Sequence, residues 1–170
     1  MSGMERASAR TAERRAHADY TGGVYGSLLA ASVVAGAGTL GSFPRVELVV
    51  LLLLTGGVFW VAHVYAHLFG ARLAQQPLGR RVVRQVCRDE WPIVKAAVPP
   101  AVAVAVSPLL GLDVQGAGWL ALGVAVAGQV GWSVAAARRA GASPRQMATA
   151  AAVNLVIGLL IVVFKLAVTH

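Results

Sequence analysis

The chain has 170 residues, of which 57% are hydrophobic and only 13% are charged, and its formal net charge is +8 at pH 7. The charged share is about half that of a typical water-soluble domain, so there are too few polar side chains to cover a water-facing surface. The basic residues lie in short runs between apolar blocks, which is typical of a protein oriented in a membrane and argues against a nucleic-acid partner.

Apolar blocks along the chain have the length of membrane-spanning helices, which need about 20 residues to cross the hydrocarbon core. The third block is the weakest, because it is short and contains Pro99-Pro100, which should kink or locally unwind its helix. We predict an all-α membrane protein, a bundle of five transmembrane helices that forms a single domain. The domain covers residues 20–170, and its spans lie at about residues 21–42, 46–69, 92–112, 118–137 and 147–169.

The positions of Lys and Arg predict the orientation, because cytoplasmic loops are enriched in both. If the N-terminus lies inside, all but two of the 15 basic residues lie on the cytoplasmic side, and only Arg45 and Lys165 lie toward the outside. Four or six spans would break this agreement. We therefore expect a cytoplasmic N-terminus and an external C-terminus in the plasma membrane of a bacterium.

The N-terminal segment, residues 1–19, has a mixed-charge polar composition and is expected to be a disordered or weakly helical cytoplasmic tail. The apolar block that follows it could instead belong to a signal peptide, with Ala35-Gly36-Ala37 as its cleavage site. This block is longer than the usual apolar core of a signal peptide, which has about 7–15 residues. Cleavage would leave four spans with the same orientation.

The connection between the second and third blocks contains an amphipathic pattern over about residues 79–90. On a helical wheel its valines and Cys87 share one side, whereas Arg80, Arg84 and Arg88 share the other. The pattern predicts a cytoplasmic interfacial helix whose arginines face anionic lipid headgroups. Such a helix can anchor the topology, and the alternative is a lipid-sensing or partner-binding role.

Polar side chains within the spans are the first candidates for a functional site, because charged groups in the bilayer centre are costly. His63 and His67 share one face of the second span, since residues four apart are neighbours on a helix. The chain direction places Gln129, Ser133 and Asn154 at a similar depth in the cytoplasmic half. If these faces converge, they form a polar layer, which is the candidate site.

Three interpretations of this layer remain open. The two histidines could pass protons toward the cytoplasm, because imidazole exchanges protons near neutral pH. They could also hold a metal ion or haem, with further metal ligands drawn from Asp89, Glu90, Cys87 or His17. The spacing of the two histidines alone is a weak metal signal, so no metal or cofactor is assigned. The simplest interpretation is that the polar groups form hydrogen bonds between packed helices.

Lys165 is the basic residue nearest the C-terminus, and its long side chain can reach the outer interface. Glu47 or Asp113 could pair with it as an outer ion pair. The simplest role is that of an interfacial anchor, and the alternative is a gating or substrate-facing lysine.

Small residues recur every four positions in the fourth span, at Gly123, Ala127 and Gly131. Small residues at this spacing let helix backbones approach closely. They could pack the monomer, a homo-oligomer or a complex with another membrane protein.

Signatures of enzymes do not occur in the sequence, which contains no HExxH, no Walker loop and no dinucleotide-binding glycine motif. Cys87 is the only cysteine, which excludes an intrachain disulfide and a CxxC motif. Every Asp and Glu lies at an expected interface or in a tail, whereas intramembrane hydrolases need a carboxylate or nucleophile inside the spans. We therefore do not expect an enzyme.

Two stretches, Phe59-Trp60-Val61-Ala62-His63-Val64-Tyr65-Ala66 and Asp89-Glu90-Trp91-Pro92, resemble small multi-pass membrane proteins of high-GC Gram-positive bacteria that have no established activity. The resemblance covers most of the chain from the second block onward. It implies a membrane location and adds no catalytic residue. The function we expect is that of a small transporter or channel-like protein for protons or cations; the alternative is a non-transporting accessory or scaffold protein.

Overall fold

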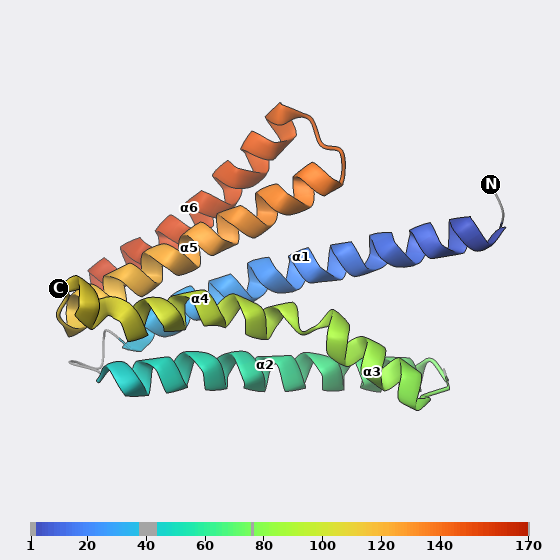
Figure 1. Cartoon of the computed structure of the whole chain (residues 1–170), viewed down its shortest axis with the longest axis horizontal. Helices are drawn as coiled ribbons and strands as arrows, with labels where there is room; N and C mark the ends of the chain where they lie inside the picture. Colours follow the sequence, from blue (N-terminus) through green and yellow to red (C-terminus); the bar gives the residue numbers. More distant parts are fainter. Residues whose placement is uncertain (1–2, 38–43, 76, 170) are drawn as a thin grey trace.

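The computed structural model describes residues 3–37, 44–75 and 77–169, and the regular elements in these ranges are all helices. Figure 1 shows their arrangement. In chain order they are α1 (Gly3–Ala37), α2 (Arg45–Leu73), α3 (Arg80–Asp89), α4 (Pro92–Val106), the 3-10 helix η2 (Ser107–Leu110), α5 (Val114–Arg139) and α6 (Pro144–Thr169). The predicted all-α class is confirmed.

Several helices are long and apolar enough to cross a membrane. Among the residues that the structure describes, four segments qualify, namely Arg45–Leu73, Arg80–Leu110, Val114–Arg139 and Pro144–Ala167. The second of them joins α3, α4 and η2, and the other three are α2, α5 and most of α6. The first predicted span, residues 21–42, begins within α1, which has 35 residues and ends at Ala37, and residues 38–42 of that span lie outside the described residues. The number of spans and their orientation stay predictions.

The helices form two groups that share α1 and α4 as their centre (Figure 1). α2 packs mainly against α4, α6 packs mainly against α5, and α1 contacts both α4 and α5. α1 and α4 therefore separate α2 from the α5–α6 hairpin. The two chain ends lie at opposite ends of the molecule (Figure 1).

The N-terminal segment was expected to be disordered or weakly helical, and in the structure it belongs to α1, which begins at Gly3 and continues without a break to Ala37. Residues 4–21 contain no Pro or Gly and are rich in Ala, Arg and Glu, which favour the helix. Helix growth from an existing turn is also much easier than nucleation. The packed C-terminal half of α1 can thus extend the helix into the polar segment.

α4 continues through Pro99 and Pro100, so the local unwinding that was one expectation for these prolines does not occur. A proline has no N–H to donate to the carbonyl four residues earlier, which removes the usual partners of the Lys95 and Ala96 carbonyls. The helix changes character only later, where η2 follows and Gly111 adopts a left-handed conformation with φ of 67°.

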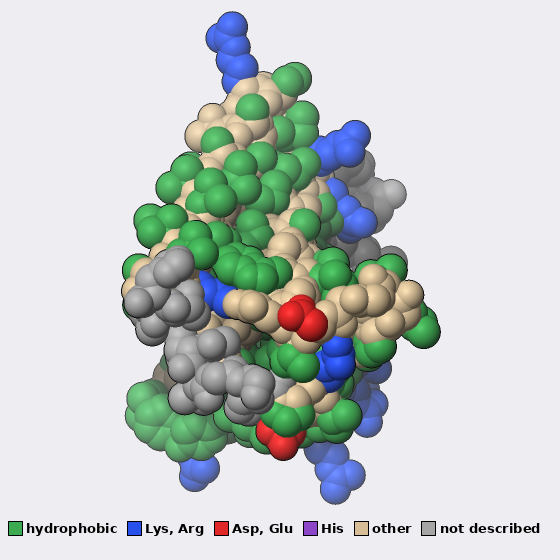
Figure 2. All heavy atoms as spheres, turned by 90° about the vertical axis from the view of Figure 1, so that its left-hand side faces the viewer, with side chains coloured by type: hydrophobic (Ala, Val, Ile, Leu, Met, Phe, Trp, Pro, Cys, Tyr) green, Lys and Arg blue, Asp and Glu red, His purple; other side chains and the backbone are tan. Residues whose placement is uncertain are grey.

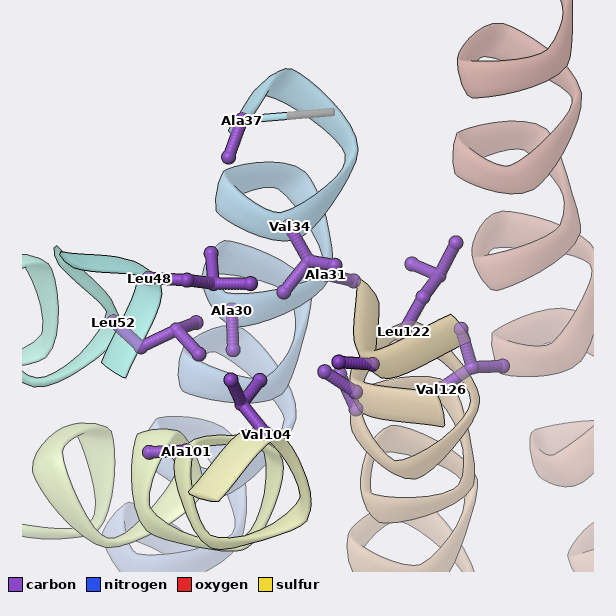
Figure 3. Packing of buried hydrophobic residues seen from close by; sticks show 13 residues of the cluster. Ala30, Ala31, Val34, Ala37, Leu48, Leu52, Ala101, Val104, Leu122 and Val126 are labelled. Carbon is purple, nitrogen blue, oxygen red and sulfur yellow. The ribbon is translucent and has the colours of Figure 1, made fainter. Parts of the chain in front are cut away.

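The buried core lies toward the end of the bundle at which α1 ends and α2 begins (Figure 3). α1 contributes Ala30, Ala31 and Val34, and these residues face Leu52 of α2 and Val104 of α4, among others. Many of the core side chains are alanines, which allow four helices to approach one another closely. This part of the interior is therefore apolar and filled.

Two glycines of α1 permit its close contacts with α4 and α5. A Cβ atom at Gly26 would lie 2.7 Å from the Ile93 carbonyl oxygen and 2.8 Å from the Ala96 Cβ. A Cβ atom at Gly23 would lie 2.4 Å from the Trp132 ring. Both positions need glycine because neighbouring helices occupy the space of a side chain.

Candidate functional site

His63 lies on the side of α2 that meets α1. Its Nδ1 is 2.9 Å from the Phe59 carbonyl oxygen. Because a carbonyl oxygen only accepts, this nitrogen is the hydrogen-bond donor. The ring also contacts Tyr25 of α1, with a centroid separation of 5.0 Å. His63 is thus held by a local hydrogen bond and an aromatic neighbour.

His67, one turn further along α2, pairs with Glu90 in the short connection between α3 and α4. Its Nδ1 lies 2.9 Å from Glu90 Oε1. The two partners differ in environment, since the Glu90 side chain is 11% exposed and that of His67 is 61% exposed. Glu90 was one of the residues that the sequence placed within possible reach of His67, and the structure brings them together.

An indole joins the same parts of the chain. Trp60 Nε1 donates a hydrogen bond of 3.0 Å to the Cys87 carbonyl oxygen. The Trp60 ring meets Trp91 edge to face, with centroids 5.5 Å apart. α2 is therefore fastened to α3 and to the start of α4 by the His67–Glu90 contact, one indole hydrogen bond and one edge-to-face aromatic contact.

The structure does not extend this cluster into a metal site. Asp89 accepts a hydrogen bond of 2.6 Å from Gln85, and the Cys87 side chain is half-buried. Among the residues that the structure describes, no group of three or more His, Cys, Asp or Glu side chains could hold a metal ion. The side chain of His17 lies outside the described ones.

The second set of predicted polar residues lies between α5 and α6. Gln129 is fully buried, and its Nε2 donates to Asn154 Oδ1 at 3.2 Å. Asn154 Nδ2 in turn donates to the Ala150 carbonyl, which fixes the orientation of its amide. Gln129 Oε1 has no hydrogen-bond partner among the residues that the structure describes. Ser133 is buried and donates to the Val130 carbonyl of its own helix.

The two sets do not converge into one layer. The histidines lie on α2 and meet α1 and Glu90, whereas Gln129 and Asn154 meet each other across the α5–α6 contact. α1 and α4 pack between these regions, as the helix contacts require. The residues were predicted at a similar depth, but depth along a span does not determine which neighbour a helix face meets.

At the other end of the bundle, Lys165 is buried against an aromatic ring. It is 5% exposed, and its Nζ lies 4.6 Å from the centroid of Trp119 on α5. Asp113 serves as the N-cap of α5, where its Oδ1 accepts the Gly116 N–H at 2.7 Å. Glu47 is exposed in the first turn of α2.

Arg45 has a structural role that the sequence did not reveal. Its Nη2 donates to the Leu112 carbonyl at 2.5 Å and its Nε donates to Ser107 Oγ at 3.2 Å. The side chain thereby ties the start of α2 to the connection between α4 and α5. An isolated Arg at the start of a span was the only sequence signal, and it did not identify the partners.

α3 covers residues 80–89, close to the expected 79–90, and its two sides differ in character. Arg80, Arg84 and Arg88 are exposed, whereas Val86 and Cys87 are half-buried toward the rest of the protein. α3 lies at the end of the bundle that holds most of the described basic residues. These residues are Arg72, Arg80, Arg81, Arg84, Arg88, Lys95, Arg138, Arg139 and Arg145.

The opposite end of the bundle carries Arg45 and Lys165 as its described basic residues. Figure 2 views this end, where acidic side chains are visible among apolar ones. The charge is thus unevenly distributed between the two ends of the helices. Comparison with known proteins adds no assignment, because no family model, curated protein or solved structure matches this chain.

Proposed function

We propose that this chain is an integral protein of the plasma membrane, a bundle of five spans with its basic end in the cytoplasm. The long apolar helices and the uneven distribution of Lys and Arg support this placement. The burial of Ala30, Ala31 and Val34 supports retention of the first span, because cleavage after it would remove part of the core. The exposed arginines of α3 favour contact with anionic headgroups of the inner leaflet.

Within this class, the geometry favours a non-transporting accessory or scaffold protein. One observation carries this choice: packed apolar side chains fill the interior where α1, α2, α4 and α5 meet. A conducting route would need polar groups or water through this region, because an ion in a dry apolar interior is very costly. The polar residues instead lie in two separate places and are engaged mainly with neighbouring backbone or side chains.

Transport of protons or cations is the second candidate, and the His67–Glu90 pair favours it. A carboxylate beside an imidazole at the basic end of the bundle provides a group that can take up a proton from the cytoplasm. His63 lies one helical turn deeper along α2 and could receive that proton. A route beyond His63 would require the apolar core to open.

Flux through purified protein in liposomes tests the two candidates. The vesicles contain a pH-sensitive dye, and separate experiments apply a proton gradient or a panel of monovalent and divalent cations. The accessory role predicts the background flux of empty vesicles, with insertion verified by flotation. Flux that His63→Ala abolishes would refute this role and favour transport. The matched variant Asn154→Ala separates a route along α2 from one along the α5–α6 contact.

A positive test of the accessory role is crosslinking in the native membrane. A scaffold protein should yield a reproducible crosslinked membrane partner of one size, and the activity or abundance of that partner should fall when this chain is deleted. If deletion changes neither the activity nor the abundance of any crosslinked protein, the accessory role fails.

A further inference from the structure

A shallow groove runs along the side of α5 that faces away from α1, beside α6. Its volume is about 710 Å³, within the range of ligand-sized cavities, which is about 300–1,000 Å³. Gly123, Ala127 and Gly131 recess its floor, since these positions carry little or no side chain. Its walls are aliphatic and come from Val126, Val130, Val134 and Ala135 of α5 and Leu155 of α6.

One end of the groove is cationic. Arg138 lines this end, which belongs to the basic end of the bundle. The adjacent Arg139 points elsewhere, because its guanidinium lies over the Tyr20 ring of α1, 5.5 Å from the centroid. The two neighbouring arginines therefore serve different surfaces, and only Arg138 is presented to the groove.

The length of the groove matches one leaflet of a bilayer. From Gly123 to Arg138 the helix rises about 22 Å, at about 1.5 Å per residue. Half of a bilayer with its headgroup layer measures about 20–22 Å. With the basic end in the cytoplasm, Arg138 lies at headgroup depth and Gly123 lies near the midplane.

We propose that this groove binds an anionic phospholipid of the inner leaflet, with one acyl chain along the small-residue floor and the phosphate on Arg138. The inference rests on the proposed membrane placement and is independent of the choice between accessory and transport roles. Charge selects a lipid over a second copy of this chain. A two-fold contact of parallel α5 helices through the same face would bring two Arg138 guanidinium groups to the same end of the interface, where they repel.

Native mass spectrometry of the purified protein tests the site with phosphatidylglycerol and phosphatidylcholine that carry identical acyl chains. The wild type should retain phosphatidylglycerol preferentially. Arg138→Gln should lower this preference about fivefold, the factor expected for one arginine at an anionic surface. The matched control is Arg145→Gln, which removes a charge from the same end of the bundle but does not line the groove.

A second variant tests the groove itself. Gly131→Leu should reduce retention of both lipids, because the leucine fills the floor. A Cβ atom at Gly131 meets nothing within 4 Å, so the variant should fold. Gly57→Leu on α2 is the control, since a Cβ atom there also meets nothing within 4 Å and the residue lies outside the groove.

The outcomes separate the possible occupants. Equal losses in Arg138→Gln and Arg145→Gln would mean diffuse attraction and would overturn the site. Unchanged lipid retention in Gly131→Leu would also overturn it. A crosslinked wild-type dimer that Gly131→Leu abolishes would assign the groove to a second copy instead. Failure of the protein to float with vesicles would refute the proposed membrane placement itself, on which the lipid site rests.

Discussion

Gly26→Ala tests whether the contact between α1 and α4 is as close as the structure has it. The added Cβ would lie 2.7 Å from the Ile93 carbonyl oxygen, whereas ordinary van der Waals contact begins at about 3.4 Å. The helices must therefore separate locally by about 0.7 Å, the difference between these two distances. A gap of that size forfeits about a quarter to a half of the dispersion energy of the contacts it opens. Neither neighbour can move aside as a flexible side chain, because one is backbone and the other is the Cβ of Ala96.

The expected cost can be measured against a matched substitution. Overpacking of this kind costs about 1–3 kcal/mol, and the better helix propensity of Ala returns up to about 1 kcal/mol. We expect Gly26→Ala to lower the free energy of unfolding by about 1–2 kcal/mol. Gly57→Ala, where no atom lies within 4 Å of the new Cβ, should be neutral or slightly stabilising. Unfolding in detergent micelles with an increasing fraction of dodecyl sulfate, followed by circular dichroism, measures both. Equal stability of the two variants would refute the close contact.

Three further predictions concern other parts of the bundle. Gln129→Leu should raise the free energy of unfolding by about 1 kcal/mol, because it removes a buried carbonyl that has no partner among the described residues and loses only one weaker hydrogen bond to Asn154. A loss of stability in the same detergent titration would contradict this prediction. Arg45→Ala should lower the free energy of unfolding by about 2 kcal/mol and speed proteolysis at the α4–α5 connection, since it removes two hydrogen bonds from a charged donor. Unchanged cleavage rates would show that the Arg45 hydrogen bonds do not hold this connection in place. In a cysteine-free background, a membrane-impermeant maleimide should label Leu109→Cys in intact cells and Arg145→Cys only after permeabilisation. The reason is that these two residues lie at opposite ends of the bundle. The reverse labelling pattern would mean that the orientation in the membrane is inverted.

Helix positions followed from the one-dimensional pattern. Long apolar blocks separated by polar breaks predicted α2, α5 and α6 near their observed ranges, and the placement of Arg and Val on opposite sides of a helical wheel predicted α3. These features depend on local composition and periodicity, which the chain carries irrespective of its partners. The N-terminal segment was expected to be disordered or weakly helical and forms one helix with the apolar segment that follows, because a polar composition that favours solvent does not by itself prevent a helix from extending.

Contacts between helices were predicted less well from the sequence than helix positions. The pairing of His67 with Glu90 was among the predicted possibilities, since both residues were expected at the cytoplasmic interface. The burial of Lys165 against Trp119 was not predicted, and neither was the fastening of Trp60 to the Cys87 carbonyl. Each of these contacts joins residues of two helices. The separation of two residues along the chain does not indicate how either helix is rotated about its axis, so it does not predict which side chains meet.

The sequence by itself determined that this protein is helical, rich in apolar segments of spanning length and basic toward one end of those segments, because hydrophobicity, helix propensity and charge are properties of the residues. Only the tertiary structure decided that His63 and Gln129 belong to different sites. That outcome depends on which helices lie between them, and packing selects those neighbours through the close fit of small residues such as Gly26 of α1 against α4. Steric fit between distant segments is a property of pairs of surfaces, so it appears only when the helices are assembled.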